Sequence, residues 1–152
     1  KRQRLDLVVN ILTNHAYHNK KIKVLGGDQL RPNIHIHDMC MSYLKVLKAP
    51  KEKINNQAFN VGFENHSVSH LANLVKKNIS EDIEIIKTVT NDNRSYHVSS
   101  EKISNLLDFK AEKTIENAVI DLKKAFNEKL LINTFDNEYY FNIKRMNNIN
   151  LK

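Results

Sequence analysis

Two arginines in polar segments, Arg31 and Arg94, have the type and setting best suited to binding a ligand. Arg31 follows a glycine pair in KVLGGDQLRPN, and Arg94 lies in NDNRSYHV. A planar guanidinium donates parallel hydrogen bonds to phosphate oxygens, so two of them on separate loops can clamp a diphosphate. Each also fits the ordinary role of a surface or capping arginine, and spacing alone does not decide between these roles.

The segment His35-x-His37-Asp38 raises the possibility of a metal site. Alternate residues of a strand point to one face, so both imidazoles could reach one ion. A zinc site needs three or four ligands with supporting partners. No matching cluster is formed by the remaining histidines, which are His15, His18, His66, His70 and His97. We therefore predict no metal site and interpret this segment as a structural junction between a strand and a helix.

Two further matches to catalytic or cofactor motifs are interpreted as accidental. Tyr17 and Lys21 have the Tyr-x-x-x-Lys spacing of some nicotinamide-dependent oxidoreductases, but Lys21 falls where the helix should give way to a strand. Gly26-Gly27 supplies two of only three glycines, so no G-x-G-x-x-G can be built. The sequence thus predicts no catalytic residue and no cofactor-binding residue on this chain.

Composition is that of an ordinary soluble domain. The chain has 152 residues, 41% apolar and 27% charged, with no apolar run near the roughly 18 residues of a membrane span. A single cysteine, Cys40, excludes an internal disulfide and indicates a reducing, cytoplasmic setting. The net charge of +7 comes mostly from lysines spread along the chain. A nucleic-acid-binding protein would need a localised basic stripe, so we expect no such function and no membrane partner.

Apolar periodicity predicts the elements that must position Arg31. A helix is expected over about 5–17, then a strand at 22–25, a glycine turn, and a loop carrying Arg31. Ile34 and Ile36 suggest a short extended segment. A helix over about 38–47 follows, with Asp38 as N-cap or first-turn acid.

The second half alternates short strands with helices. Strands are expected at 57–61 and about 83–89, and helices end near 78 and 107. The predicted helix caps are Ser67, then Ser99 or Ser100, and Thr114. The pattern predicts a small α/β fold with short strands and about five helices, over residues 1–128. Residues 129–152 are expected to form a C-terminal tail.

Four segments, in this order, resemble one protein family: RLDLVVN, KIKVLGGDQLRPNIHIHDMCMSYL, FNVG and DNRSYHVSSEKI. The family is the extended short-chain dehydrogenase group of NAD-dependent sugar-nucleotide epimerases and dehydratases. The tail segment YYFNIK also looks like the ending of relatives. The resemblance covers nearly the whole chain but only about the C-terminal half of such an enzyme.

The resemblance implies a role on the substrate side. Enzymes of this family bind NAD and carry their catalytic residues on an N-terminal Rossmann domain, and a smaller α/β domain holds the nucleotide-sugar. Arg31 matches the arginine that contacts the diphosphate, and Arg94 matches a second phosphate-binding arginine. Asn10 and the backbone near Lys23 and Val24 fall where the family positions the nucleotide and base.

Departures from the family pattern bear on activity. The chain lacks the glycine loop and the catalytic Ser/Tyr/Lys set, so by itself it should neither hold NAD well nor turn over; NAD would be bound by the rest of the parent enzyme. It starts at Lys1 inside an expected helix, so we expect a fragment or the second half of a split gene. His35 and Asp38 are expected to brace the loop behind Arg31. The alternative is a non-catalytic nucleotide-sugar-binding module, or a subunit that docks onto a separate Rossmann protein.

Overall fold

A parallel pair of short strands organises the larger part of the fold. β1 (Lys21–Leu25) lies beside β4 (Glu84–Thr88), with Ile22 opposite Ile85. Ile22 and Val24 are fully buried, while the alternate residues of β1 are exposed. This period-2 pattern places one face of the strand pair against helices.

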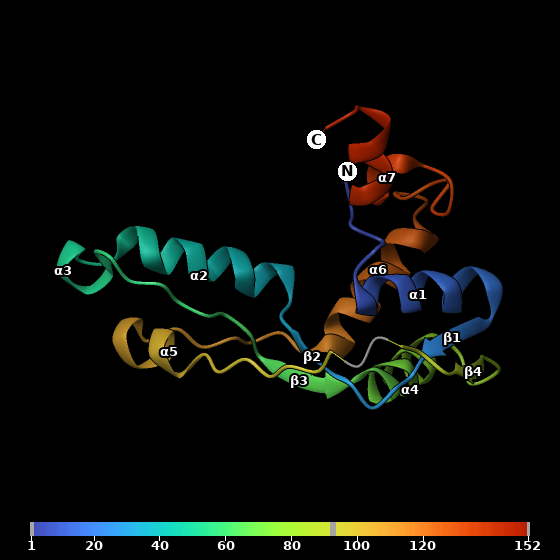
Figure 1. Cartoon of the computed structure of the whole chain (residues 1–152), viewed down its shortest axis with the longest axis horizontal. Helices are drawn as coiled ribbons and strands as arrows, with labels where there is room; N and C mark the ends of the chain where they lie inside the picture. Colours follow the sequence, from blue (N-terminus) through green and yellow to red (C-terminus); the bar gives the residue numbers. More distant parts are fainter. Residues whose placement is uncertain (1, 92–93, 152) are drawn as a thin grey trace.

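The computed structural model describes residues 2–91 and 94–151. The helices are α1 (Val8–Asn19), α2 (Ile36–Lys48), α3 (Lys51–Ile54), α4 (Val68–Ile79), α5 (Glu101–Leu107), α6 (Ile115–Asn127) and α7 (Asn142–Asn148), with a 3-10 turn η1 (Glu138–Tyr140). A second pair of strands, β2 (Leu30–Asn33) and β3 (Glu64–Ser67), is antiparallel. The predicted small α/β fold with short strands is confirmed (Figure 1).

The main core lies where α1, α4 and α6 pack on one another and on β1. Caps fix the starts of two of these helices. The Ser67 hydroxyl accepts a hydrogen bond from the backbone N–H of His70 at 3.2 Å, and Thr114 forms a reciprocal capping box with Asn117. Both caps were predicted, and each satisfies backbone donors that a helix start leaves unpaired.

Two smaller apolar clusters complete the molecule. The helices α2, α3 and α5 form an elongated arm (Figure 1). Its apolar cluster consists of Ile103 and Leu107 of α5 together with Phe109. The other cluster joins α6 to the tail and includes Leu5 and Tyr140. It brings the two ends of the chain close together, as Figure 1 shows.

Two predictions around Arg31 were wrong. Arg31 lies in strand β2, opposite His66, and not in a loop. The following helix starts at Ile36 and not near Asp38, with His35 as its N-cap. Of the two roles predicted for Asp38, the first-turn acid is confirmed and the N-cap is not. Lys21–Leu25 and the start of α1 at Val8 differ from the predictions by only a few residues.

The predicted strand at 57–61 is absent, and the next strand is β3 at Glu64–Ser67. Phe59 and Val61 are half-buried against the arm cluster, and Asn60 between them is exposed, as in a strand with one buried face. Within residues 2–91 and 94–151, however, the backbone from 59 to 61 forms no hydrogen bond. The segment has the pattern of a strand but no partner strand.

Candidate functional site

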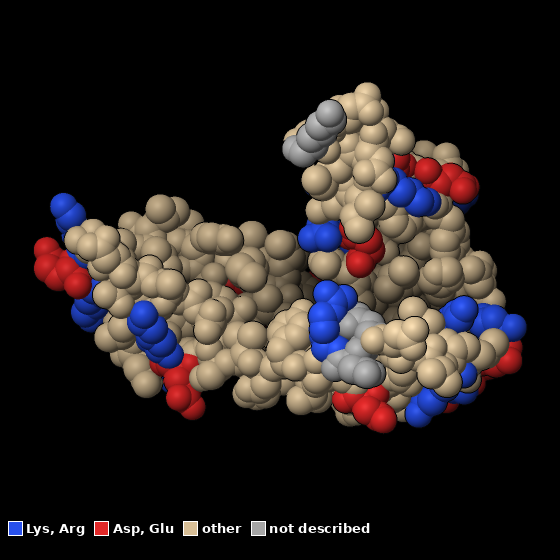
Figure 2. All heavy atoms as spheres, in the orientation of Figure 1, with Lys and Arg blue, Asp and Glu red and all other residues tan. Residues whose placement is uncertain are grey.

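A groove of about 1470 Å³ runs between α1, β2 and α6. It is lined by Asn10, Lys23, Arg31 and Arg94, which are four of the five residues predicted to bind substrate. Figure 2 shows a hollow between the α2 arm and the lobe formed by the tail, with Lys and Arg side chains beside it. The groove's cationic residues, Arg2, Arg4, Lys23, Arg31, Arg94 and Lys124, outnumber its acidic residues, Asp6, Asp121 and Glu128. Such an excess of positive charge favours an anionic ligand.

Arg31 and Arg94 lie next to each other at this groove. The Nη1 atom of Arg31 donates to the backbone carbonyl oxygens of Leu30, at 2.9 Å, and Arg94, at 2.5 Å. The Arg31 guanidinium carbon also lies 5.5 Å from the centre of the Tyr96 ring. These contacts fix one edge of the guanidinium, so that less conformational freedom is lost when it binds an anion.

The segment that carries Arg94 is held along the β2–β3 pair. Ser95 accepts a hydrogen bond from the backbone N–H of Leu30 at 2.9 Å. Asn65 pairs with the backbone of Val98 in both directions, donating at 3.1 Å and accepting at 2.9 Å. The loop therefore runs beside β2, which brings Arg31 and Arg94 together from distant parts of the sequence.

The other predicted site residues differ in their surroundings. The Asn10 side chain donates to the carbonyl oxygen of Arg4 at 2.7 Å, at the rim of the groove. Lys23 is exposed on β1 and lines the groove. Val24 is fully buried in the core, so any contact with a ligand is restricted to its backbone.

The His-x-His-Asp segment forms separate local contacts. His35 Nδ1 accepts from the backbone N–H of His37 at 3.1 Å, and His35 Nε2 lies 3.3 Å from an Asp121 carboxylate oxygen. Asp38 is buried and accepts from the backbone N–H of Lys113 at 2.8 Å. Across residues 2–91 and 94–151, no group of three or more His, Cys, Asp or Glu side chains is placed to hold a metal ion.

An ion pair that the sequence analysis did not single out lies at the other side of the groove. Asp6 Oδ1 contacts Arg4 Nε at 3.0 Å, and Asp6 Oδ2 accepts from the backbone N–H of Asn142 at 2.9 Å. Partial burial acts to raise the pKa of Asp6, but the hydrogen bonds from Arg4 and Asn142 and the Arg4 charge outweigh it and lower the pKa. The R-x-D spacing is visible in the sequence, but the contact with the tail is not.

The glycine pair does not offer a cradle for a dinucleotide. Gly26 and Gly27 both have positive φ, 72° and 131°. The positions that a Cβ atom would take are already crowded by Thr90 and Gln29 at Gly26, and by Ser69 at Gly27. The turn is therefore closed by its own neighbours.

Comparison with known proteins supports the fold and the family resemblance. Residues 2–62 match the sequence model of the NAD dependent epimerase/dehydratase family. The dTDP-glucose 4,6-dehydratase of Bacillus anthracis, solved with NAD, is 17% identical with a TM-score of 0.67, over 93% of this chain and 43% of that one. The UDP-glucose 4-epimerase of Thermotoga maritima, solved with UDP-glucose, is 19% identical with a TM-score of 0.71, over 82% and 40%.

A third solved structure shares this fold. The ADP-L-glycero-D-manno-heptose-6-epimerase of Helicobacter pylori is 20% identical with a TM-score of 0.67, over 79% of this chain and 37% of that one. This chain thus spans about two fifths of the length of these proteins. The family match and the shared fold confirm the predicted resemblance to NAD-dependent epimerases and dehydratases.

In the part of the chain that the structure describes, no helix has the length and apolar character needed to cross a membrane.

Proposed function

We propose that this chain is the C-terminal, nucleotide-sugar-binding portion of an NAD-dependent epimerase/dehydratase, and that Arg31 and Arg94 bind the diphosphate. This proposal rests on the observation that Arg31 and Arg94 line the same groove, in which cationic residues outnumber acidic ones, and that the Arg31 side chain donates to the Arg94 carbonyl oxygen. The UDP-glucose bound to the T. maritima epimerase supports a nucleotide-sugar as the ligand. In this proposal residues 1–128 form the binding portion and residues 129–152 form its tail.

The diphosphate supplies most of the recognition that this groove can offer. A hydrogen bond between an arginine and a phosphate oxygen contributes about 1.5–3 kcal/mol, because one or both partners are charged. Arg31 keeps one edge of its guanidinium on backbone carbonyl oxygens, which orients the group toward a fixed position. The redox chemistry belongs to NAD, which would be held by the other half of the complete enzyme.

The arm has an exposed apolar surface, which supports the proposal that a second half of the enzyme packs on it. α2 carries an apolar stripe at helical spacing, formed by Ile36, Cys40, Tyr43, Leu44 and Leu47. The most exposed of these is Leu47, at 79%. A stripe of this kind on one helix face is normally covered by another element, and its exposure marks an interaction surface.

The unpaired backbone from 59 to 61 is a second feature of the same arm. An extended segment with free N–H and C=O groups can add to the edge of a sheet. The solved structures are more than twice as long as the part that this chain covers. We assign the second half of the enzyme, a Rossmann α/β unit in cis or in trans, as the occupant of the stripe and of the 59–61 edge.

Binding of nucleoside diphosphates tests the proposed function. The full chain should be titrated with UDP, dTDP, ADP, GDP and CDP by calorimetry. Arg31→Gln should weaken the best of them about ten- to a hundredfold, since one charge-assisted contact is lost. Lys77→Gln removes the same charge from an exposed site on α4 outside the groove and should leave the affinity unchanged. Equal affinity of wild type and Arg31→Gln would overturn the assignment.

The DNA upstream of Lys1 distinguishes the enzyme from the alternative, a non-catalytic subunit. A continuous frame upstream of Lys1 that encodes a glycine loop and a Tyr-x-x-x-Lys motif would favour the enzyme. A start codon directly before Lys1, with a stable product that binds nucleoside diphosphates, would favour the separate subunit. In either case charge substitution in the stripe, such as Leu47→Glu, should abolish assembly with the Rossmann half without changing diphosphate affinity.

A further inference from the structure

The C-terminal tail is hydrogen-bonded to the segment that precedes α1, and we call this arrangement the clasp. The backbone N–H of Leu5 donates to the carbonyl oxygen of Tyr140 at 2.9 Å, and Arg2 Nε donates to that of Tyr139 at 2.9 Å. Leu5 is fully buried in the cluster that joins α6 to the tail. These contacts connect the two ends of the sequence, and through them the tail holds residues 2–6 in place.

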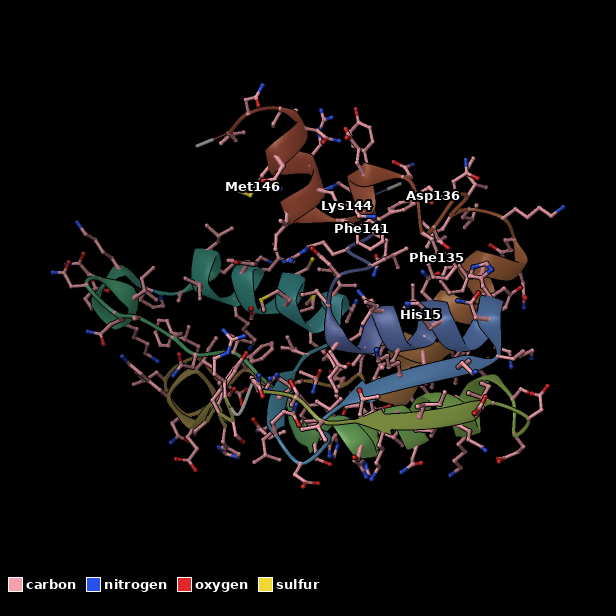
Figure 3. All side chains as sticks on the ribbon, turned by 45° about the vertical axis from the view of Figure 1, so that its right-hand side comes forward. His15, Phe135, Asp136, Phe141, Lys144 and Met146 are labelled. Carbon is pink, nitrogen blue, oxygen red and sulfur yellow. The ribbon has the colours of Figure 1, made fainter. Side chains whose placement is uncertain are left out.

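Figure 3 shows how the tail covers α1. Phe141 and Lys144 lie in the lobe above the helix, and Phe135 lies beside His15. The Phe135 and His15 ring centres are 5.0 Å apart, and Lys144 Nζ is 4.5 Å from the centre of the Phe141 ring. The centre of the Phe135 ring also lies 5.9 Å from that of the His18 ring, so Phe135 anchors the lobe on α1.

Within this clasp Arg4 is fixed from both sides. Its Nε pairs with Asp6 at 3.0 Å, and its carbonyl oxygen accepts from Asn10 at 2.7 Å. Asp6 is held in turn by the backbone N–H of Asn142. The Arg4 side chain is 43% exposed and lines the groove, and its two Nη groups have no partner within residues 2–91 and 94–151.

This arrangement presents an oriented cation to the groove. A free arginine side chain loses rotamer entropy when it is fixed, and here part of that loss occurs on folding. The Nε bond orients the guanidinium plane and leaves the Nη groups, which suit phosphate oxygens. Arg4 precedes α1 whereas Arg31 lies on β2, so the two cations come to the groove from different walls.

We propose that Arg4 is a further phosphate-binding residue of the groove, and that Asp6 and the tail position it. This inference rests on the proposed function, because it assumes that a diphosphate occupies the groove. The diphosphate would then bridge the Arg31 wall and the Arg4 wall. Asp6 does not touch the ligand and acts through Arg4.

Titration of inorganic pyrophosphate into the full chain at low salt tests this assignment. Arg4→Gln should weaken binding about tenfold and reduce its salt dependence, because one charge pair is removed. Asp6→Asn should weaken binding about threefold but keep most of the salt dependence, since the cation remains. Arg4→Lys should fall between wild type and Arg4→Gln. Lys77→Gln removes the same charge from an exposed site on α4, outside both the groove and the tail, and as the control it should bind as wild type does.

A side-chain nitrogen spectrum separates ligand contact from a purely structural role. The Arg4 resonances should shift when pyrophosphate is added to wild type, and they should shift less in Asp6→Asn. If Arg4→Gln lowers the unfolding temperature but leaves affinity and salt dependence unchanged, Arg4 is a structural pin and the proposal is wrong. If Arg31→Gln loses binding and Arg4→Gln does not, only this inference fails. If wild type binds no pyrophosphate, both this inference and the proposed function fail.

Discussion

Replacing Asp38 by alanine should destabilise the fold by about 2–4 kcal/mol. Asp38 is only 2% exposed, in the first turn of α2, and accepts a 2.8 Å hydrogen bond from the backbone N–H of Lys113. A hydrogen bond to a charged group contributes about 1.5–3 kcal/mol. An acidic side chain at a helix N-terminus adds about 0.3–1 kcal/mol through the helix dipole. Their sum gives the predicted loss, because alanine provides neither contribution.

Urea unfolding at pH 7, followed by helical circular dichroism, measures this loss. Asp38→Asn keeps an oxygen acceptor and should lose about half as much as Asp38→Ala, since only the charge is removed. Asp28→Ala, at an exposed position between β1 and β2, is the control and should change the unfolding free energy by less than about 0.5 kcal/mol.

A second readout localises the effect. Exchange of the Lys113 amide hydrogen should become faster in Asp38→Ala than that of amides in α4. An unfolding free energy within about 0.5 kcal/mol of wild type would refute the reasoning, because a buried acceptor would then contribute nothing.

Three other substitutions or conditions test separate parts of the structure. Gly27→Ala should lower the unfolding free energy by more than about 1 kcal/mol, because φ is positive there and the new Cβ would collide with Ser69; calorimetric melting measures it. Thr114→Ala should cost about 1 kcal/mol in urea unfolding, because the capping box with Asn117 is lost, and an unchanged midpoint would contradict this. Burial lowers the pKa of His15 from 6.5, so the folded state binds a proton less readily than the unfolded state. Stability should therefore fall as the pH drops below about 6.5, and His15→Gln should flatten this profile.

Local sequence signals predicted the parts of the fold that local chemistry decides. Ser67 and Thr114 cap the helices that they were expected to cap, because a hydroxyl before an apolar periodic run satisfies the first N–H groups. The strand Lys21–Leu25 follows from its alternation of lysine with Ile22 and Val24, which places those two side chains in the core.

Features that depend on distant partners were not predictable in this way. Arg31 was expected in a loop that follows the Gly26-Gly27 turn. Residues 30–33 instead pair with β3 as an edge strand, where Pro32 is tolerated. The segment 57–61 has a strand pattern, but within the described residues its backbone forms no strand ladder. The Asp6–Asn142 contact joins residues at opposite ends of the chain, and no local rule reports it.

The candidate site follows the same division. Arg31 and Arg94 could be singled out from their settings in the sequence, and Asn10 and Lys23 from the family resemblance. All four line one groove. The role that we propose for Arg4 could not be seen in the sequence, because it depends on the contact of Asp6 with Asn142 of the tail.

The central claim is that this groove binds the diphosphate of a nucleotide-sugar. A crystal structure of the full chain with the nucleoside diphosphate that binds best in the titration tests it most directly. Our account predicts that the diphosphate lies in the groove with phosphate oxygens within hydrogen-bonding distance of the Arg31 guanidinium. A diphosphate bound away from Arg31, with the groove empty, would contradict the account.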